Sequence, residues 1–223
     1  MKLLYFSDPM CSWCYGFTTV IDKIQENYPQ VEIEIIPGGY SPGNKEVMSE
    51  KYKNMLQRAW ASVNLASGQA FDYSMKFVHD KFCYDTEPSS RAFHVIQELV
   101  PEKSYEFLKL MQSNFYAEGK DITKEEILAD LAEKFGIERE VFIEKFNSKD
   151  IFLKTNQGFL KSRELGVTGF PSLIGEKDSS LTMITPGFQA FENVQSILNT
   201  WLNEQKVDAD SNDHSCNKGS CKR

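Results

Sequence analysis

Residues 8–17 read Asp-Pro-Met-Cys-Ser-Trp-Cys-Tyr-Gly-Phe, and the rest of the chain is organised around this stretch. An apolar run precedes it and a helical pattern follows, so Cys11 and Cys14 are expected at the turn from a strand into a helix. The first turn of a helix has unpaired N–H groups and the positive end of the helix dipole, which stabilise a thiolate. Because Cys11 is nearer the helix start and such a residue is usually the more exposed of the pair, we predict that it is the nucleophile and that Cys14 is the resolving thiol.

A Cys-x-x-Cys pair is also half of a tetrahedral zinc site, which is the main alternative. The strand before the motif and the helix after it favour a redox role instead. We therefore expect a dithiol centre without a metal ion or an organic cofactor.

Composition limits the classes of function and partner. The 223 residues include 25 basic and 32 acidic ones, giving a net charge of −7. An acidic chain without a basic cluster is a poor candidate for binding nucleic acid or an anionic membrane. The apolar start is too short for a signal peptide and no apolar run is long enough to span a membrane, so we expect a cytoplasmic protein. In a reducing compartment, five cysteines indicate catalysis, metal binding or burial rather than a disulfide framework.

The order of elements predicts an α/β fold with an insertion. Residues 1–43 read as strand, helix, strand; residues 44–165 read as helices only; and residues 166–204 read as strand, strand, helix. The economical architecture has the two outer segments in one sheet, with the helical block as an inserted domain. Residues 205–223 are polar and read as a disordered tail.

Apolar side chains at helical spacing define the inserted block, and we interpret its aromatic and Met stripes as core packing. Within it, Thr123 followed by Glu126 has the form of a capping box, which predicts a helix start at Thr123.

Three stretches carry a family resemblance: the motif at residues 8–17, Gly-Lys-Asp-Ile-Thr at 119–123, and Gly-Val-Thr-Gly-Phe-Pro at 166–171. Together they resemble the DsbA-like family of thiol-disulfide oxidoreductases, specifically its cytoplasmic FrnE-like branch. The resemblance covers about residues 2 to 203. It implies a thioredoxin fold with a large helical insertion.

The resemblance also implies a substrate site. It implies that the bond between Phe170 and Pro171 is cis and lies against Cys11, where the backbone of Phe170 pairs with a substrate chain. Trp13 and Phe170 would line a groove for extended or unfolded protein chains together with the helical block. The Ser12-Trp13 dipeptide lacks the His that makes some members strong oxidants, so the redox potential does not carry over.

Four further residues have weaker signals. Asp8 is either a proton acceptor near the dithiol or a turn-capping residue, and the sequence leaves both open. Cys83 reads as a small buried apolar residue. His79 and His94 have no second ligand at metal spacing and read as structural.

The tail pair Cys216 and Cys221 has three open interpretations: a second dithiol that exchanges with the first, a metal clip with His214, or no role. A thioredoxin fold sends its last helix away from the active end, so contact with the first dithiol is not the preferred state.

The leading hypothesis is a thiol-disulfide oxidoreductase or isomerase acting on thiol- or disulfide-containing proteins, and on glutathione as a candidate partner. One alternative is a cytosolic adaptor or a redox- or zinc-sensing binding protein on the same fold. Another is glutathione-dependent isomerisation of a small molecule, as in the related kappa-class transferases and chromene carboxylate isomerases. The sequence does not predict the substrate, the direction of electron flow, the electron donor or the oligomeric state.

Overall fold

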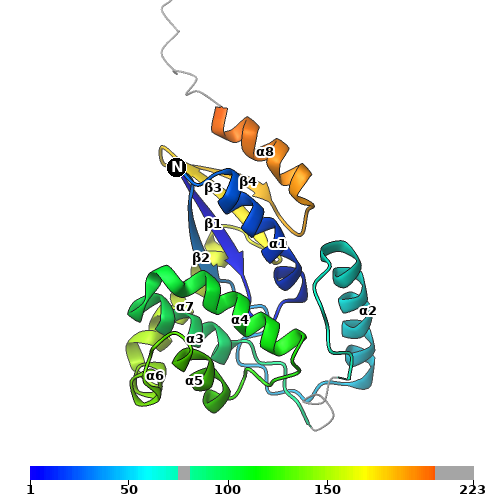
Figure 1. Ribbon diagram of the computed structural model, residues 1–223, viewed down its shortest axis with the longest axis vertical. Helices are drawn as coiled ribbons and strands as arrows, with labels where there is room; N and C mark the ends of the chain where they lie inside the picture. The colour runs from blue at the N-terminus through cyan, green and yellow to red at the C-terminus, as the bar shows by residue number, and fades with distance from the viewer. Residues whose placement is uncertain (75–80, 204–223) are drawn as a thin grey trace, which may run out of the picture.

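The sheet has four strands, and the computed structural model describes residues 1–74 and 81–203. The strands are β1 (Lys2–Ser7), β2 (Glu32–Pro37), β3 (Ser172–Lys177) and β4 (Ser180–Thr185). Their order across the sheet is β2-β1-β3-β4 (Figure 1). β1 is parallel to β2 and antiparallel to β3, and β3 is antiparallel to β4. The two outer segments of the chain therefore share one sheet, as predicted.

Eight α-helices complete the described residues: α1 (Ser12–Asn27), α2 (Glu50–Ser67), α3 (Glu87–Leu99), α4 (Ser104–Tyr116), α5 (Glu125–Glu133), α6 (Arg139–Phe146), α7 (Lys149–Glu164) and α8 (Phe191–Asn203). In Figure 1, α1 and α8 lie side by side along the sheet, α2 stands beside the start of α1, and α3 to α7 gather at one end of the sheet. The helical insertion between β2 and β3 is therefore confirmed, whereas separate domain boundaries at 44 and 165 stay a prediction. None of the helices in the described part of the chain is long and apolar enough to cross a membrane.

Alternation along β1 divides its side chains between two apolar clusters. Leu3 and Tyr5 point into the large cluster that α1 and α8 also enter, while Leu4 and Phe6 point into a smaller one on the opposite face. The smaller cluster contains Phe170 at its edge. The loop before β3 is therefore held by the face of the sheet that α1 does not cover.

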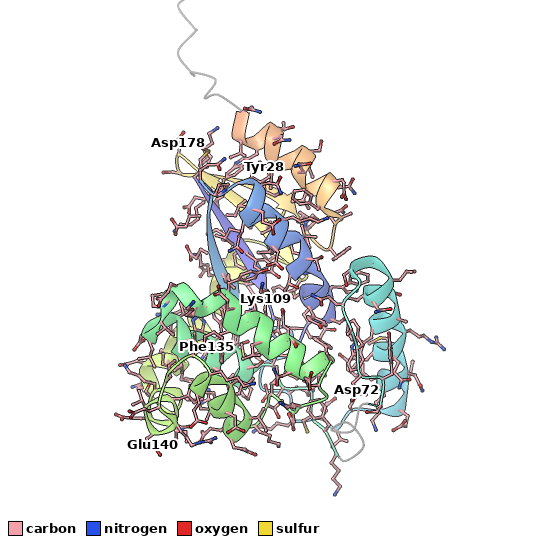
Figure 2. All side chains as sticks on the ribbon, viewed as in Figure 1. Tyr28, Asp72, Lys109, Phe135, Glu140 and Asp178 are labelled. Carbon is pink, nitrogen blue, oxygen red and sulfur yellow. The ribbon has the colours of Figure 1, made fainter. Side chains whose placement is uncertain are left out.

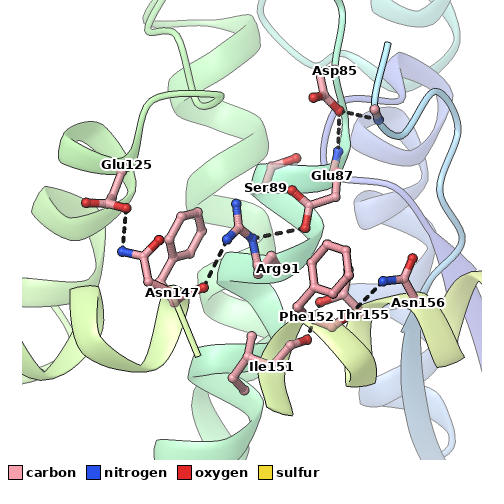
Figure 3. Close-up of polar contacts among 12 residues, drawn as sticks. Asp85, Glu87, Ser89, Arg91, Glu125, Asn147, Ile151, Phe152, Thr155 and Asn156 are labelled. Carbon is pink, nitrogen blue, oxygen red and sulfur yellow. Dashed lines mark hydrogen bonds and ion pairs between the residues drawn. The ribbon is translucent and has the colours of Figure 1, made fainter. Parts of the chain in front are cut away.

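The insertion is fastened to the sheet layer through α1. Asp22 of α1 accepts hydrogen bonds from Tyr105 and Lys109 of α4 at 2.8 and 2.9 Å, and Figure 2 shows Lys109 on the side of α4 that faces α1. Within the insertion, Arg91 of α3 pairs with Glu87 and donates to a carbonyl at the end of α6 (Figure 3). These contacts join α4 to α1 and α3 to α6.

The capping box predicted at Thr123 is wrong. Helix α5 begins at Glu125 after Lys124, which makes no capping bond with its side chain. Both the backbone N–H and the hydroxyl of Thr123 donate to the carboxylate of Asp121. Because this local turn already uses the Thr123 side chain, the hydroxyl is not available to cap a helix.

Candidate active site

The dithiol lies where the sequence predicts, at the turn from β1 into α1. Cys11 has an extended backbone (φ −93°, ψ 116°) and occupies the position directly before the first helical residue, Ser12. Cys11 is 8% exposed, whereas Cys14, one turn further along, is fully buried. Both are free thiols. A large partner therefore reaches the sulfur of Cys11 before that of Cys14.

The surroundings of Cys14 keep it protonated in the free dithiol. Burial raises the pKa of the Cys14 thiol well above its ordinary value, and a hydrogen bond with Cys11 raises it further. A thiol in this state is a weak nucleophile until its proton is removed. The two sulfurs are therefore chemically distinct although they are only one helical turn apart.

The loop before β3 brings the backbone of Phe170 to Cys11. The bond between Phe170 and Pro171 is cis, which confirms the expectation from the family resemblance. The Cys11 thiol donates to the Phe170 carbonyl, with 3.5 Å between Sγ and O. Trp13 is half-buried, and its ring packs against Phe188 with 5.1 Å between the ring centroids.

The ring of Phe170 packs on Gly38, a residue that the sequence analysis missed. Gly38 follows β2, and a Cβ atom added to it would lie 1.9 Å from Cε1 of Phe170. Only glycine therefore allows the ring to pack there, and the backbone of Phe170 is left facing Cys11. The signal in the sequence was a glycine directly after a buried strand, which marks a close approach of another chain segment.

Asp8 is a buried turn residue. Its carboxylate accepts hydrogen bonds from the backbone N–H groups of Met10 and Tyr40, at 2.8 and 2.7 Å. Burial raises the pKa of Asp8 to about 6, against the opposing effect of these bonds. The Asp8 carbonyl also accepts from the Cys11 N–H at 3.1 Å. Asp8 therefore shapes the turn that presents Cys11.

Two tyrosines from the insertion hold the residue before Cys11. The hydroxyls of Tyr84 and Tyr116 both donate to the carbonyl of Met10, which is fully buried. The Gln112 amide also approaches the Asp8 carbonyl, at 3.5 Å. These contacts span more than 70 positions of sequence, and no local motif marks them.

The remaining candidates lie apart from the dithiol. Cys83 is half-buried rather than buried, so that prediction is wrong: its bridge partner Val47 is itself exposed, and its thiol donates to the Lys45 carbonyl at 3.2 Å instead of packing in the core. His94 is buried, its Nδ1 lies 3.0 Å from the side-chain oxygen of Gln97, and burial lowers its pKa to about 4.

The other predicted residues, His79, Cys216, Cys221 and the tail at 205–223, lie outside the described residues. Within residues 1–74 and 81–203, no three His, Cys, Asp or Glu side chains are placed to hold a metal ion.

A comparison with protein families agrees with this geometry. The model of the DSBA-like thioredoxin domain matches residues 2–199. This chain belongs to the DSBA-like thioredoxin domain family. In this fold β1 pairs with β3, which brings the turn that carries Cys11 next to the loop with the cis proline although 159 positions separate Cys11 from Phe170.

Solved structures resemble this chain over most of its length. A putative protein disulfide isomerase from Nitrosomonas europaea is 33% identical, with a TM-score of 0.84 over 90% of this chain and 97% of that one. The cytosolic disulfide reductase DsbM from Pseudomonas aeruginosa is 22% identical, with a TM-score of 0.76 over 91% and 98% of the two chains. The second likeness is evidence for the fold alone.

Curated relatives of this chain include adapter proteins. The ClpXP adapter protein SpxH of Bacillus subtilis is 23% identical over 92% of this chain and 69% of its own length. Two further SpxH adapters, from Bacillus licheniformis and Halalkalibacterium halodurans, are 26% and 22% identical, and this chain spans 57% and 60% of their lengths.

Proposed function

We propose that this protein is a thiol-disulfide oxidoreductase that acts on protein disulfides through Cys11 and Cys14. The observation that carries the proposal is the position of Cys11, at the start of α1 with its sulfur 3.5 Å from the Phe170 carbonyl. A dithiol needs one accessible sulfur to attack and one protected sulfur to resolve, and the exposures of the two cysteines fit these roles.

In the first step, the thiolate of Cys11 attacks one sulfur of a substrate disulfide. The substrate S–S bond breaks, its other sulfur leaves as a thiolate that takes up a proton, and a mixed disulfide links the substrate to Cys11. The Phe170 carbonyl, released from the Cys11 thiol, then accepts a backbone N–H of the substrate chain. Trp13, two positions after Cys11, is a further candidate contact.

In the second step, Cys14 loses its proton and attacks the sulfur of Cys11. A Cys11–Cys14 disulfide forms, the mixed disulfide breaks, and the substrate cysteine leaves as a thiol. Two electrons have then passed from the dithiol to the substrate. The reverse sequence oxidises a substrate dithiol.

We further propose that the protein works in the cytoplasm and in the reducing direction. The support is the structural likeness to DsbM, which is described as a cytosolic disulfide reductase and has also been solved with glutathione. If the Cys11–Cys14 couple had a reduction potential of about −120 mV, a cytosolic glutathione potential of about −250 mV would favour its dithiol form over its disulfide form by about 6 kcal/mol. Glutathione is the candidate electron donor that returns the disulfide to the dithiol.

Trapping of the mixed disulfide tests the proposal. In Cys14→Ser the resolving thiol is absent, so a disulfide-bonded protein substrate should stay linked to Cys11 and be released by dithiothreitol. Cys11→Ser should trap nothing, and Cys83→Ser should behave as the parent protein. Equal trapping by Cys11→Ser and Cys14→Ser would contradict the assigned roles. Small-molecule turnover that survives in Cys14→Ser would favour the isomerase alternative instead.

A second candidate function is that of an adapter for a ClpXP-type protease. It is favoured by the three SpxH relatives, which share 22–26% identity with this chain. An adapter binds its partner without turnover of the dithiol. Delivery of a protein to the protease that persists in a Cys11→Ser, Cys14→Ser double variant would support this function over the first.

A further inference from the structure

A cavity beside the dithiol has no part in the mechanism above. It measures about 390 Å³ and lies between the segment after β2, the start of α2 and the segment that leads into α3. The residues that matter for its chemistry are Ser41, Asn44, Glu46, Ser49, Tyr52 and Tyr84. A volume of this size is within the usual range for ligand pockets, about 300–1,000 Å³.

One side chain that lines the cavity is hydrogen-bonded to Met10, the residue before Cys11. Tyr84 lines the cavity, and its hydroxyl donates to the Met10 carbonyl. Tyr52 lies edge-on to Tyr84, with 6.2 Å between the ring centroids, and Tyr40 meets Tyr84 in the same way. The N–H of Tyr40 is bound by Asp8. A substrate held covalently on Cys11 would therefore place its neighbouring residues beside these rings.

The lining of the cavity combines one acidic side chain with neutral hydroxyl and aromatic groups. Among the described residues that line it, Glu46 is the one that carries a charge, and its exposed carboxylate makes no ion pair with another described residue. Burial, Tyr40 and Cys11 raise the pKa of Tyr52, so its phenol stays neutral. A neutral aromatic face attracts a cation through its quadrupole, and the hydroxyl oxygens of Ser41 and Ser49 add acceptors.

We propose that this cavity binds the lysine or arginine side chain of a residue that flanks the reactive cysteine of the substrate protein. The inference rests on the proposed oxidoreductase function and adds a substrate class to it: disulfides in basic sequence. Adjacent residues are about 3.8 Å apart along a chain, and a long cationic side chain adds reach, so a flanking residue can extend from Cys11 past Tyr84. The acidic balance of the whole protein, −7, also favours the approach of a basic segment.

The test compares peptides that differ only in the charge beside the cysteine. Each peptide carries one cysteine as a mixed disulfide with thionitrobenzoate, flanked by Lys, Ala or Glu, and the full-length protein is assayed for kcat/KM. We expect about a tenfold preference for Lys over Ala, the combined scale of a weak ion pair and cation–π contacts, and a value for Glu below that for Ala. The preference should shrink as salt is added.

Two variants assign the preference to the cavity. Glu46→Gln removes the ion pair and leaves the aromatic contacts, so it should reduce the Lys-to-Ala ratio to about threefold. Glu140→Gln, which removes a charge from α6 at the far side of the insertion from α2 (Figure 2), should keep the tenfold ratio. Because each ratio is taken within one variant, a change in overall activity does not affect the result.

The outcomes separate this inference from the function on which it rests. Equal kcat/KM for all three peptides, or a preference that is as large in Glu46→Gln as in the parent protein, overturns the cavity proposal and leaves the oxidoreductase function standing. If no peptide is turned over, the oxidoreductase proposal fails. Calorimetric titration with the same peptides carrying serine in place of cysteine then decides on the cavity, since equal affinity for the Lys and Glu peptides overturns it as well.

Discussion

Replacement of Gly38 by alanine should displace the loop that faces Cys11. The new Cβ would lie 1.9 Å from the ring of Phe170, whereas ordinary contact begins at 3.4 Å, so the ring must move by about 1.5 Å. The backbone φ of Gly38 is not in the left-handed region, so alanine brings no backbone strain of its own. Overpacking of this kind costs about 1–3 kcal/mol, which lowers the melting temperature of a chain of this length by about 2–4 °C per kcal/mol.

The same change should slow thiol-disulfide exchange. The Phe170 carbonyl is now 3.5 Å from the sulfur of Cys11, and a ring shift of this size moves the residue that carries it. Misplacement by about 1 Å at a reacting centre can cost up to 100-fold in rate, so we expect at least a tenfold loss of kcat/KM in Gly38→Ala. Denaturant unfolding and an assay of disulfide reduction measure the two effects.

Two further variants make the reasoning refutable. Gly169→Ala introduces a Cβ with no atom within 4 Å, so it should stay within about 0.5 kcal/mol of the parent protein. Phe170→Leu lacks the ring atoms that collide, so the cost of Gly38→Ala should fall by about 1 kcal/mol or more in that background. If Gly38→Ala destabilises the protein no more than Gly169→Ala does, or by the same amount in the Phe170→Leu background as in the parent protein, the packing of the Phe170 ring on Gly38 is not what makes the change costly.

Two further predictions concern buried polar groups. The pKa of His94 is about 4 in the folded protein against an ordinary 6.5, so this group should lower the free energy of unfolding of the wild type by about 3 kcal/mol as the pH drops from 6.5 to 4. The pKa of Asp8 is about 6 in the folded protein against 3.8, so Asp8 should raise the free energy of unfolding by about 3 kcal/mol as the pH drops from 6 to 3.8. Relative to wild type, His94→Gln should therefore gain stability on acidification and Asp8→Asn should lose it, measured by urea unfolding at pH 7 and pH 4.5; parallel curves for all three proteins would contradict the assignment. Tyr84→Phe and Tyr116→Phe should each cost about 1 kcal/mol, and the double variant should cost more than the sum because the buried Met10 carbonyl then has no hydroxyl donor. Strictly additive losses in denaturant unfolding would mean that the two hydroxyls do not share this acceptor.

The order of elements was predictable because hydrophobic periodicity changes at each boundary. Alternation of Ile33 and Ile35 with charged residues marks β2, and the spacing of Val194, Leu198 and Trp201 marks α8. Such patterns report which face of an element is buried, and burial here follows the pattern closely. The position of the dithiol was predictable for the same reason, since the Cys-x-x-Cys motif falls between two strongly patterned segments.

The polar support of the site was not predictable from local patterns. Tyr84 and Tyr116 look like members of apolar stripes, and the hydroxyl of a buried tyrosine leaves no trace in helical periodicity. In a sequence, a glycine such as Gly38 that is needed for a neighbouring ring has the same appearance as one that is needed for a turn. Thr123 was misassigned because Asp121, two residues earlier, competes for its side chain. Each case depends on a partner that only the folded chain identifies.

The measurement that tests the central claim most directly is a glutathione redox titration of Cys11 and Cys14. A variant with serine at 83, 216 and 221 leaves only these two thiols, and their state is read by alkylation and mass analysis. The account predicts one reversible two-electron transition, in which both cysteines become protected together. If both thiols are alkylated at every glutathione ratio, no disulfide forms between them, and the oxidoreductase function is contradicted.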